Sequence, residues 1–90
     1  MKTVRAKIEG TVQGVFFRKF LKEQADGLGI KGHVRNLDTG EIEVMAEGAD
    51  DQVNELMKRC KKGAPHSQVK NVLVQELNHI GFDDFKILRM

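Results

Sequence analysis

The order in which the hydrophobic period changes along the chain constrains its fold most strongly. Apolar residues alternate with polar ones in residues 3–9, as in a half-buried strand. They then recur every three or four positions after Val15, as in an amphipathic helix that Gly27 and Gly29 end. The later segments read as strand, strand, helix and strand, at residues 30–35, 41–47, 48–62 and 69–76, and residues 85–87 predict a short final strand.

This β-α-β-β-α-β order plus a short C-terminal strand predicts an α+β fold. The expected arrangement is a ferredoxin-like split βαβ sandwich, with two helices on one face of an antiparallel sheet. A chain of this length holds one core, so we expect residues 1–90 to form a single domain. The open sheet face should carry Arg5, Lys7, Glu41 and Glu43, and we expect the acidic residues of the third strand to be solvated.

The apolar stripes of the two helices predict which side chains pack against the sheet. Phe17 and Phe20 lie on the first stripe, where packing is favoured over a role in a substrate pocket. Phe16 falls off this stripe and could line the mouth of a site. Cys60 lies on the second stripe, which favours a buried structural thiol over a nucleophile. Val69 and Val72 break the alternation of their strand, which predicts a β-bulge near Asn71.

Composition and motifs exclude several classes of partner and cofactor. Fifteen Lys and Arg against thirteen Asp and Glu leave a net charge of +2, too small to indicate nucleic-acid binding. The single cysteine, together with an N-terminus that lacks a signal-peptide segment, predicts a reducing cytoplasmic location and no membrane partner. The sequence has no cysteine pair, H-E-x-x-H motif or nucleotide-binding loop, so we expect no metal and no cofactor.

The start of the first predicted helix breaks an electrostatic rule that the second helix obeys. Asp50 and Asp51 stand at the start of the second helix, where the positive end of the helix dipole favours acidic residues. The first helix instead carries Arg18, Lys19 and Lys22 near its start. No Ser, Thr, Asp or Asn stands just before this helix as a cap. A bound anion such as phosphate would supply the missing cap and balance these cations.

The loop before this helix has the composition of an anion cradle. Its sequence, GTVQGVFFR at residues 10–18, contains two glycines that permit a sharp turn and let backbone N–H groups point at a ligand. Arg18 can add a bidentate guanidinium contact to the same anion. We expect the cradle to be formed by the backbone N–H groups of Gln13, Gly14, Val15, Phe16, Phe17 and Arg18.

Two segments carry a resemblance to a known family. GTVQGVFFR resembles the phosphate-cradle signature of the acylphosphatases, G-x-V-Q-G-V-x-F-R, and GHVRNLDTGEIE at residues 32–43 resembles their second signature. The similarity runs from about Val4 to Ile87. It implies that Arg18 binds the phosphoryl group and that Asn36 orients the attacking water, whereas the residues alone would equally allow a turn-forming Asn36.

The resemblance implies metal-independent hydrolysis of the carboxyl-phosphate bond of small-molecule acyl phosphates, without a cofactor. The products are a carboxylate and inorganic phosphate, and we expect inorganic phosphate to inhibit the hydrolysis as well. A carboxylate whose conjugate acid has a pKa of about 4 leaves without a general acid, so the site needs mainly positioning and charge stabilisation. The chain has His33 where the family commonly has a bulky aromatic, which we expect to affect packing or acyl-group preference. We expect a monomer.

Two other classes of function use the same fold. A non-catalytic anion-binding regulatory module would use the loop without turnover, although Asn36 would then have no role. An RNA-binding ferredoxin-like domain would stack bases on aromatic residues of the open sheet face. The open-face residues of the first and third predicted strands include no aromatic, which argues against RNA binding: Arg5, Lys7, Glu9, Glu41, Glu43 and Met45.

Overall fold

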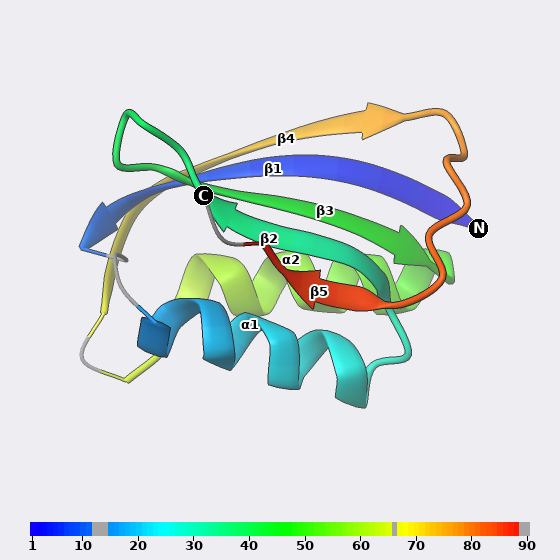
Figure 1. Ribbon diagram of the computed structural model, residues 1–90, viewed down its shortest axis with the longest axis horizontal. Helices are drawn as coiled ribbons and strands as arrows, with labels where there is room; N and C mark the ends of the chain where they lie inside the picture. The colour runs from blue at the N-terminus through cyan, green and yellow to red at the C-terminus, as the bar shows by residue number, and fades with distance from the viewer. Residues whose placement is uncertain (12–14, 66, 89–90) are drawn as a thin grey trace.

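Two helices cover one face of a five-stranded sheet (Figure 1). The computed structural model describes residues 1–11, 15–65 and 67–88. Its elements are β1 (Lys2–Thr11), α1 (Val15–Gly27), β2 (Lys31–Asn36), β3 (Ile42–Gly48), α2 (Asp50–Lys62), β4 (Gln68–Leu77) and β5 (Phe85–Ile87). The predicted order of elements and the two-layer α+β sandwich are confirmed.

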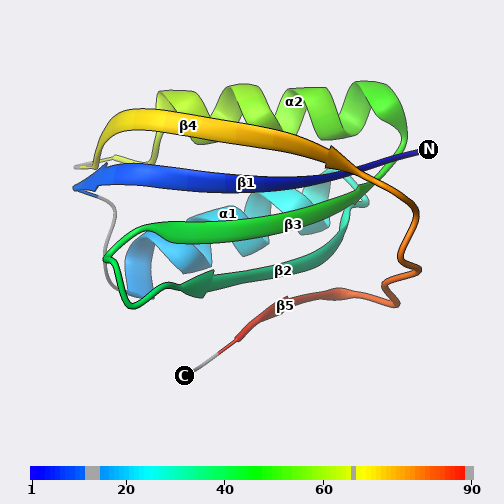
Figure 2. The ribbon, with the colours of Figure 1, turned by 90° about the horizontal axis from the view of Figure 1, so that it is seen from above.

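The sheet has the strand order β4-β1-β3-β2-β5 and is mixed, so the prediction of an antiparallel sheet is wrong for its last strand. The pairs β1–β3, β1–β4 and β2–β3 are antiparallel, whereas β5 runs parallel to β2 with Gly32 opposite Phe85. The segment after β4 passes around one end of the sheet and enters β5 beside the start of β2 (Figure 2). Because β5 starts where β2 starts, the two strands run in the same direction.

The core lies between the sheet and the helices. Phe17 of α1 is buried and Phe20 packs against the same cluster, with 6.1 Å between the two ring centroids, so packing is confirmed for both. Cys60 of α2 is fully buried, as predicted, and burial raises the pKa of its thiol to about 12. The largest fully buried side chains are those of Ile8, Leu21, Ile42, Leu56, Val4, Val34, Val44, Val53 and Cys60.

The predicted bulge in β4 is present. Asn71 pairs with Glu9, whereas Val69 pairs with Gly10, so the register shifts and Lys70 is the extra residue. Gly10 has a φ of 139°, and a Cβ built there would lie 2.1 Å from the Gln68 carbonyl oxygen. This close approach of β1 to β4, just before the loop that leads to α1, is open only to glycine.

The prediction that the acidic residues of the third strand are solvated is wrong for Glu43. This residue lies on the sheet face away from the helices, but only 3% of it is exposed. Its carboxylate accepts hydrogen bonds from Arg5 Nε at 2.7 Å and Arg35 Nε at 2.8 Å, and His33 Nε2 lies 3.4 Å away. Burial alone would raise the pKa of Glu43, but these donors outweigh it and lower the pKa to about 2.

The same prediction is wrong for Glu47, which is 4% exposed. Its carboxylate accepts hydrogen bonds from three consecutive backbone N–H groups, those of Ile80, Gly81 and Phe82, at 2.8, 2.9 and 3.1 Å. The Thr3 hydroxyl donates a fourth bond. Burial raises the pKa of Glu47, yet the four donors together lower it to about 2. Glu47 thus fixes the segment that carries the chain from β4 to β5.

Candidate active site

The first turn of α1 contains the described residues of the predicted anion cradle. The helix begins at Val15, as predicted, so the N–H groups of residues 15–18 form its first turn. The first four N–H groups of an α-helix have no acceptor within the helix and are available to an anion. This turn contains no acidic residue. The remaining predicted cradle residues, Gln13 and Gly14, lie outside the described residues.

Two side chains of this turn have opposite environments. Phe17 is buried in the core and holds the start of α1 against the sheet. Phe16 is 85% exposed, in agreement with its predicted position off the apolar stripe. Arg18 is partly buried one residue further along the helix. The core therefore anchors the turn through Phe17 while its neighbours remain near solvent.

Asn36 is the last residue of β2, where it pairs with Ile42 of β3. Side chains alternate along a strand, so Asn36 lies on the same sheet face as Val34, the face that the helices cover. Among the residues that the structure describes, its buried Oδ1 atom has no hydrogen-bond partner. Buried polar atoms without a partner are rare in folded proteins, and each needs a specific explanation.

The turn after β2 does not use the Asn36 side chain. Leu37 N–H donates to the Glu41 carbonyl at 2.8 Å, and Gly40 N–H donates to the Leu37 carbonyl at 3.0 Å. Gly40 has a φ of 90°, which favours glycine at this position. Because these backbone bonds close the turn while Asn36 Oδ1 bonds no described residue, the geometry argues against a turn-forming role for this side chain.

The sheet and α1 bring these two regions to one end of the molecule. The end of β2 and the start of α1 lie near each other in two perpendicular views (Figures 1 and 2). The site thus combines the backbone donors of a helix start and a guanidinium with an amide oxygen from a neighbouring strand. Such a set can hold an oxyanion and a water molecule, but it offers no strong acid or base.

Two sequence-based expectations on metals and membranes concern the whole described chain. Within residues 1–11, 15–65 and 67–88, no group of three or more His, Cys, Asp or Glu side chains could hold a metal ion. No helix in these ranges is long and apolar enough to cross a membrane.

A network of charged side chains around Glu43, which the sequence patterns did not predict, supports β2, the strand of Asn36. Glu43 lies directly across from Lys7 on one side and Arg35 on the other. A glutamate with a cation opposite it on both neighbouring strands was the available signal. His33 joins this network and packs edge-on against Phe82, with 5.8 Å between ring centroids, on the face away from Asn36. His33, which stands where the family commonly has a bulky aromatic, therefore lies on the opposite face of the sheet from the candidate site.

Comparisons with known proteins identify the family of the chain. The family model described as Acylphosphatase matches residues 4–87. An acylphosphatase of Thermotoga petrophila is 40% identical over 87 residues, which cover 97% of each chain. An acylphosphatase of Rubrobacter xylanophilus is 47% identical over 75 residues, which cover 83% of this chain and 68% of the relative.

Comparison of the fold with solved structures indicates the same family. The crystal structure of an acylphosphatase from Bacillus subtilis matches with a TM-score of 0.94 at 34% identity, covering 99% of this chain and 100% of that chain. The family model and the T. petrophila relative likewise span almost all of the sequence. The chain belongs to the acylphosphatase family.

Proposed function

We propose that the first turn of α1 and the end of β2 form the active site of an acylphosphatase. As a member of this family, the protein is a hydrolase that acts on acyl phosphates and yields a carboxylate and inorganic phosphate. The observation that carries the proposed mechanism is the buried, unpartnered Oδ1 of Asn36 among the described residues. Asn36 ends β2 on the helix-covered face, and β2 ends at the end of the molecule where α1 begins (Figure 1).

The phosphoryl group is held at the start of α1. The N–H groups of residues 15–18, together with those of Gln13 and Gly14, bind its oxygens at the positive end of the helix dipole. The Arg18 guanidinium adds two parallel charge-assisted hydrogen bonds. These donors stabilise the charge that the equatorial oxygens carry in a loose transition state.

Asn36 holds the attacking water. Its Oδ1 accepts a hydrogen bond from the water and aims the water oxygen at phosphorus, in line with the bond to the acyl oxygen. As the new P–O bond forms, the old one breaks and its electron pair leaves with the carboxylate. The water proton passes to the phosphate product, because a neutral amide is too weak a base to retain it.

The remaining expectations follow from the same site and belong to this proposal. A carboxylate leaves unprotonated, so the reaction needs neither a general acid nor a metal. We propose that residues 1–90 act as one domain and as a monomer, without nucleic-acid or membrane partners. The buried thiol of Cys60 is compatible with a cytoplasmic location.

Release of phosphate from benzoyl phosphate tests the proposal, with EDTA present and absent. We expect equal rates in both conditions and competitive inhibition by inorganic phosphate. Rates that EDTA abolishes and magnesium or zinc restores would contradict the mechanism. Stoichiometric phosphate binding without turnover would instead support the regulatory anion-binding module.

A further inference from the structure

We infer that a groove between the two helices binds the acyl group of the substrate and favours acyl groups with a second negative charge at their far end. This inference rests on the proposed function, because it concerns the substrate class of the same site. Phe20 and Gln24 of α1, Arg59 and Lys62 of α2, and residues 63–65 line this interhelical groove. Its volume is about 480 Å³, within the range of small-molecule sites and ample for a benzoyl group.

The lining of the interhelical groove is both apolar and cationic. Phe20, Ala64 and Pro65 supply apolar surface, and Arg59 and Lys62 supply two basic side chains, of which Arg59 is ion-paired with Glu55. None of the described residues that line it is acidic. A ligand that fits this lining has an apolar body and an anionic terminus.

Arg59 is held in place before any ligand arrives. Its Nε donates to Glu55 Oε2 at 3.0 Å, and one terminal nitrogen donates to Gln24 Oε1 at 2.8 Å, which links α2 to α1. A guanidinium has five N–H donors, and these two bonds use two of them. The other donors can serve a carboxylate at little cost in side-chain entropy, since the side chain is already ordered.

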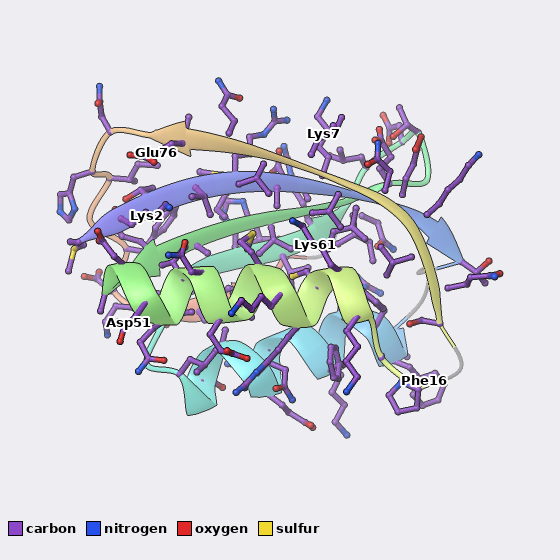
Figure 3. All side chains as sticks on the ribbon, turned by 180° about the vertical axis from the view of Figure 1, so that it is seen from behind. Lys2, Lys7, Phe16, Asp51, Lys61 and Glu76 are labelled. Atoms are coloured by element: carbon purple, nitrogen blue, oxygen red, sulfur yellow. The ribbon has the colours of Figure 1, made fainter. Side chains whose placement is uncertain are left out.

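The interhelical groove is connected to the proposed phosphate site through α1. Phe16 and Phe20 are four residues apart, so they lie on one side of the helix, one turn from each other. Phe16 projects from the first turn of α1 at the end of the molecule where α2 also ends (Figure 3). It is 85% exposed and therefore accessible to a ligand. Phe16 and Phe20 thus place apolar surface on the side of α1 between the proposed phosphate site and the groove.

A para-substituted benzoyl phosphate matches these features. Its phosphoryl group binds at the start of α1, its ring packs on the two phenylalanines, and a para-carboxylate reaches Arg59 and Lys62. Benzoyl phosphate has the same phosphoryl group and ring but an uncharged acyl group, so it makes every contact except that of the para-carboxylate. The ratio of kcat/KM for 4-carboxybenzoyl phosphate to that for benzoyl phosphate therefore isolates the contribution of the two cations.

The ratio should be measured for the parent protein and for Arg59→Gln, Lys62→Gln and Lys61→Gln. We expect it to fall about tenfold in each groove variant, as for loss of one charge-assisted hydrogen bond. Lys61→Gln is the matched control, since it removes the same charge from the side of α2 away from α1 (Figure 3). Its ratio should stay unchanged.

The outcomes separate this inference from the proposed function. Failure of the parent protein to hydrolyse benzoyl phosphate would overturn the proposed function. Normal hydrolysis with an unchanged ratio in both groove variants, or an equal fall in Lys61→Gln, would overturn the groove assignment alone. If Arg59→Gln unfolds because it loses the link between the helices, the exposed Lys62→Gln decides the question.

Discussion

Backbone N–H groups converge at residues 80–82 and at residues 15–18, and of these two clusters only the one at 80–82 surrounds an acidic side chain of the described residues. At residues 80–82, three consecutive N–H groups donate to the buried carboxylate of Glu47. At residues 15–18, the first turn of α1 contains no acidic residue. The donors at 80–82 serve the fold, whereas we assign those at 15–18 to a substrate anion.

The absence of an acidic residue from the first turn of α1 is not shared by the other helix. The first turn of α2 contains Asp50 and Asp51, and its last turn contains Arg59, Lys61 and Lys62. Both helices have thirteen residues and pack on the same sheet face, so they differ mainly in this charge placement. Because α2 obeys this rule and α1 breaks it, the start of α1 is the better candidate for a functional site.

The largest test removes the side chain that we assign to the anion at 15–18. Arg18→Ala should lower kcat/KM by a factor of about 10³ or more, as for other arginines that stabilise a transferring phosphoryl group. Phosphate affinity should fall as well, and Arg18→Lys should restore little because it lacks the planar fork. Steady-state kinetics and phosphate titration measure both. Wild-type turnover in Arg18→Ala would show that Arg18 does not serve an anion at residues 15–18.

Asn36→Ala tests whether a second element completes the site. We expect turnover to fall by a factor on the order of 10²–10³, the cost of losing one positioned catalytic group. Phosphate affinity should remain close to that of the parent, because Asn36 is proposed to contact only water. Circular dichroism confirms folding. An equal loss of phosphate affinity would move Asn36 into the cradle, and full turnover would leave it a purely structural residue.

Glu47→Gln tests the structural side of the comparison. The folded pKa of about 2 lies below the ordinary glutamate value of 4.5, so this carboxylate stabilises the fold fully above pH 4.5 and loses its contribution as the pH falls towards 2. At about 1.4 kcal/mol per pKa unit, the variant should lose about 3 kcal/mol of unfolding free energy at pH 7.

Denaturation of Glu47→Gln at several pH values should also show a shallower acid dependence than the parent protein. Part of the dependence should remain, because Glu43 has the same low pKa. Glu76→Gln, at an exposed position of β4, is the control. Equal stability of Glu47→Gln and the parent at pH 7 would show that the three N–H groups do not need the charge.

Phosphate should stabilise the protein through the donors at 15–18. At a concentration of 100 times its dissociation constant, a ligand that binds only the folded state adds about 2.7 kcal/mol. Thermal melts in phosphate and in chloride at equal ionic strength separate specific binding from screening. The shift should disappear in Arg18→Ala. No difference between the two salts would mean that the start of α1 is not an anion site.

We expect the smallest effect from placing an acidic residue in the first turn of α1. Val15 is exposed at the first helical position, so Val15→Glu should raise the unfolding free energy without phosphate by about 0.3–1 kcal/mol. The same change should weaken phosphate binding and turnover. Asp51→Asn is the matched opposite in α2 and should lower stability by a similar amount without affecting turnover. A Val15→Glu variant that gains no stability would show that the dipole is not what distinguishes the helices.

The sequence predicts most of the fold because its elements depend on local patterns. The alternation in β1 and the apolar stripes of α1 and α2 are set by residues a few positions apart. The direction of β5 and the burial of Glu43 and Glu47 depend on partners more than thirty residues away, apart from Arg35 and His33. A single sequence contains no direct record of such pairings.

The candidate site divides in the same way. The broken dipole rule at the start of α1 is a local signal, and it suffices to propose an anion site with Arg18. Asn36 has no such signal, since an asparagine before a turn is ordinary, and the family resemblance alone suggested its role. The unpartnered Oδ1 appears only in three dimensions. The interhelical groove likewise needs both helices to be placed on the sheet.

The burial of Cys60 has a consequence for how the molecule can be observed. Burial raises the pKa of the Cys60 thiol to about 12, so the thiol stays protonated at neutral pH, whereas alkylating reagents attack the thiolate. Reaction therefore requires α2 to separate from the sheet and expose the sulfur. The rate of alkylation by iodoacetamide therefore reports how often α2 opens locally. Because Cys60 is the sole cysteine of the sequence, the signal comes from a single site.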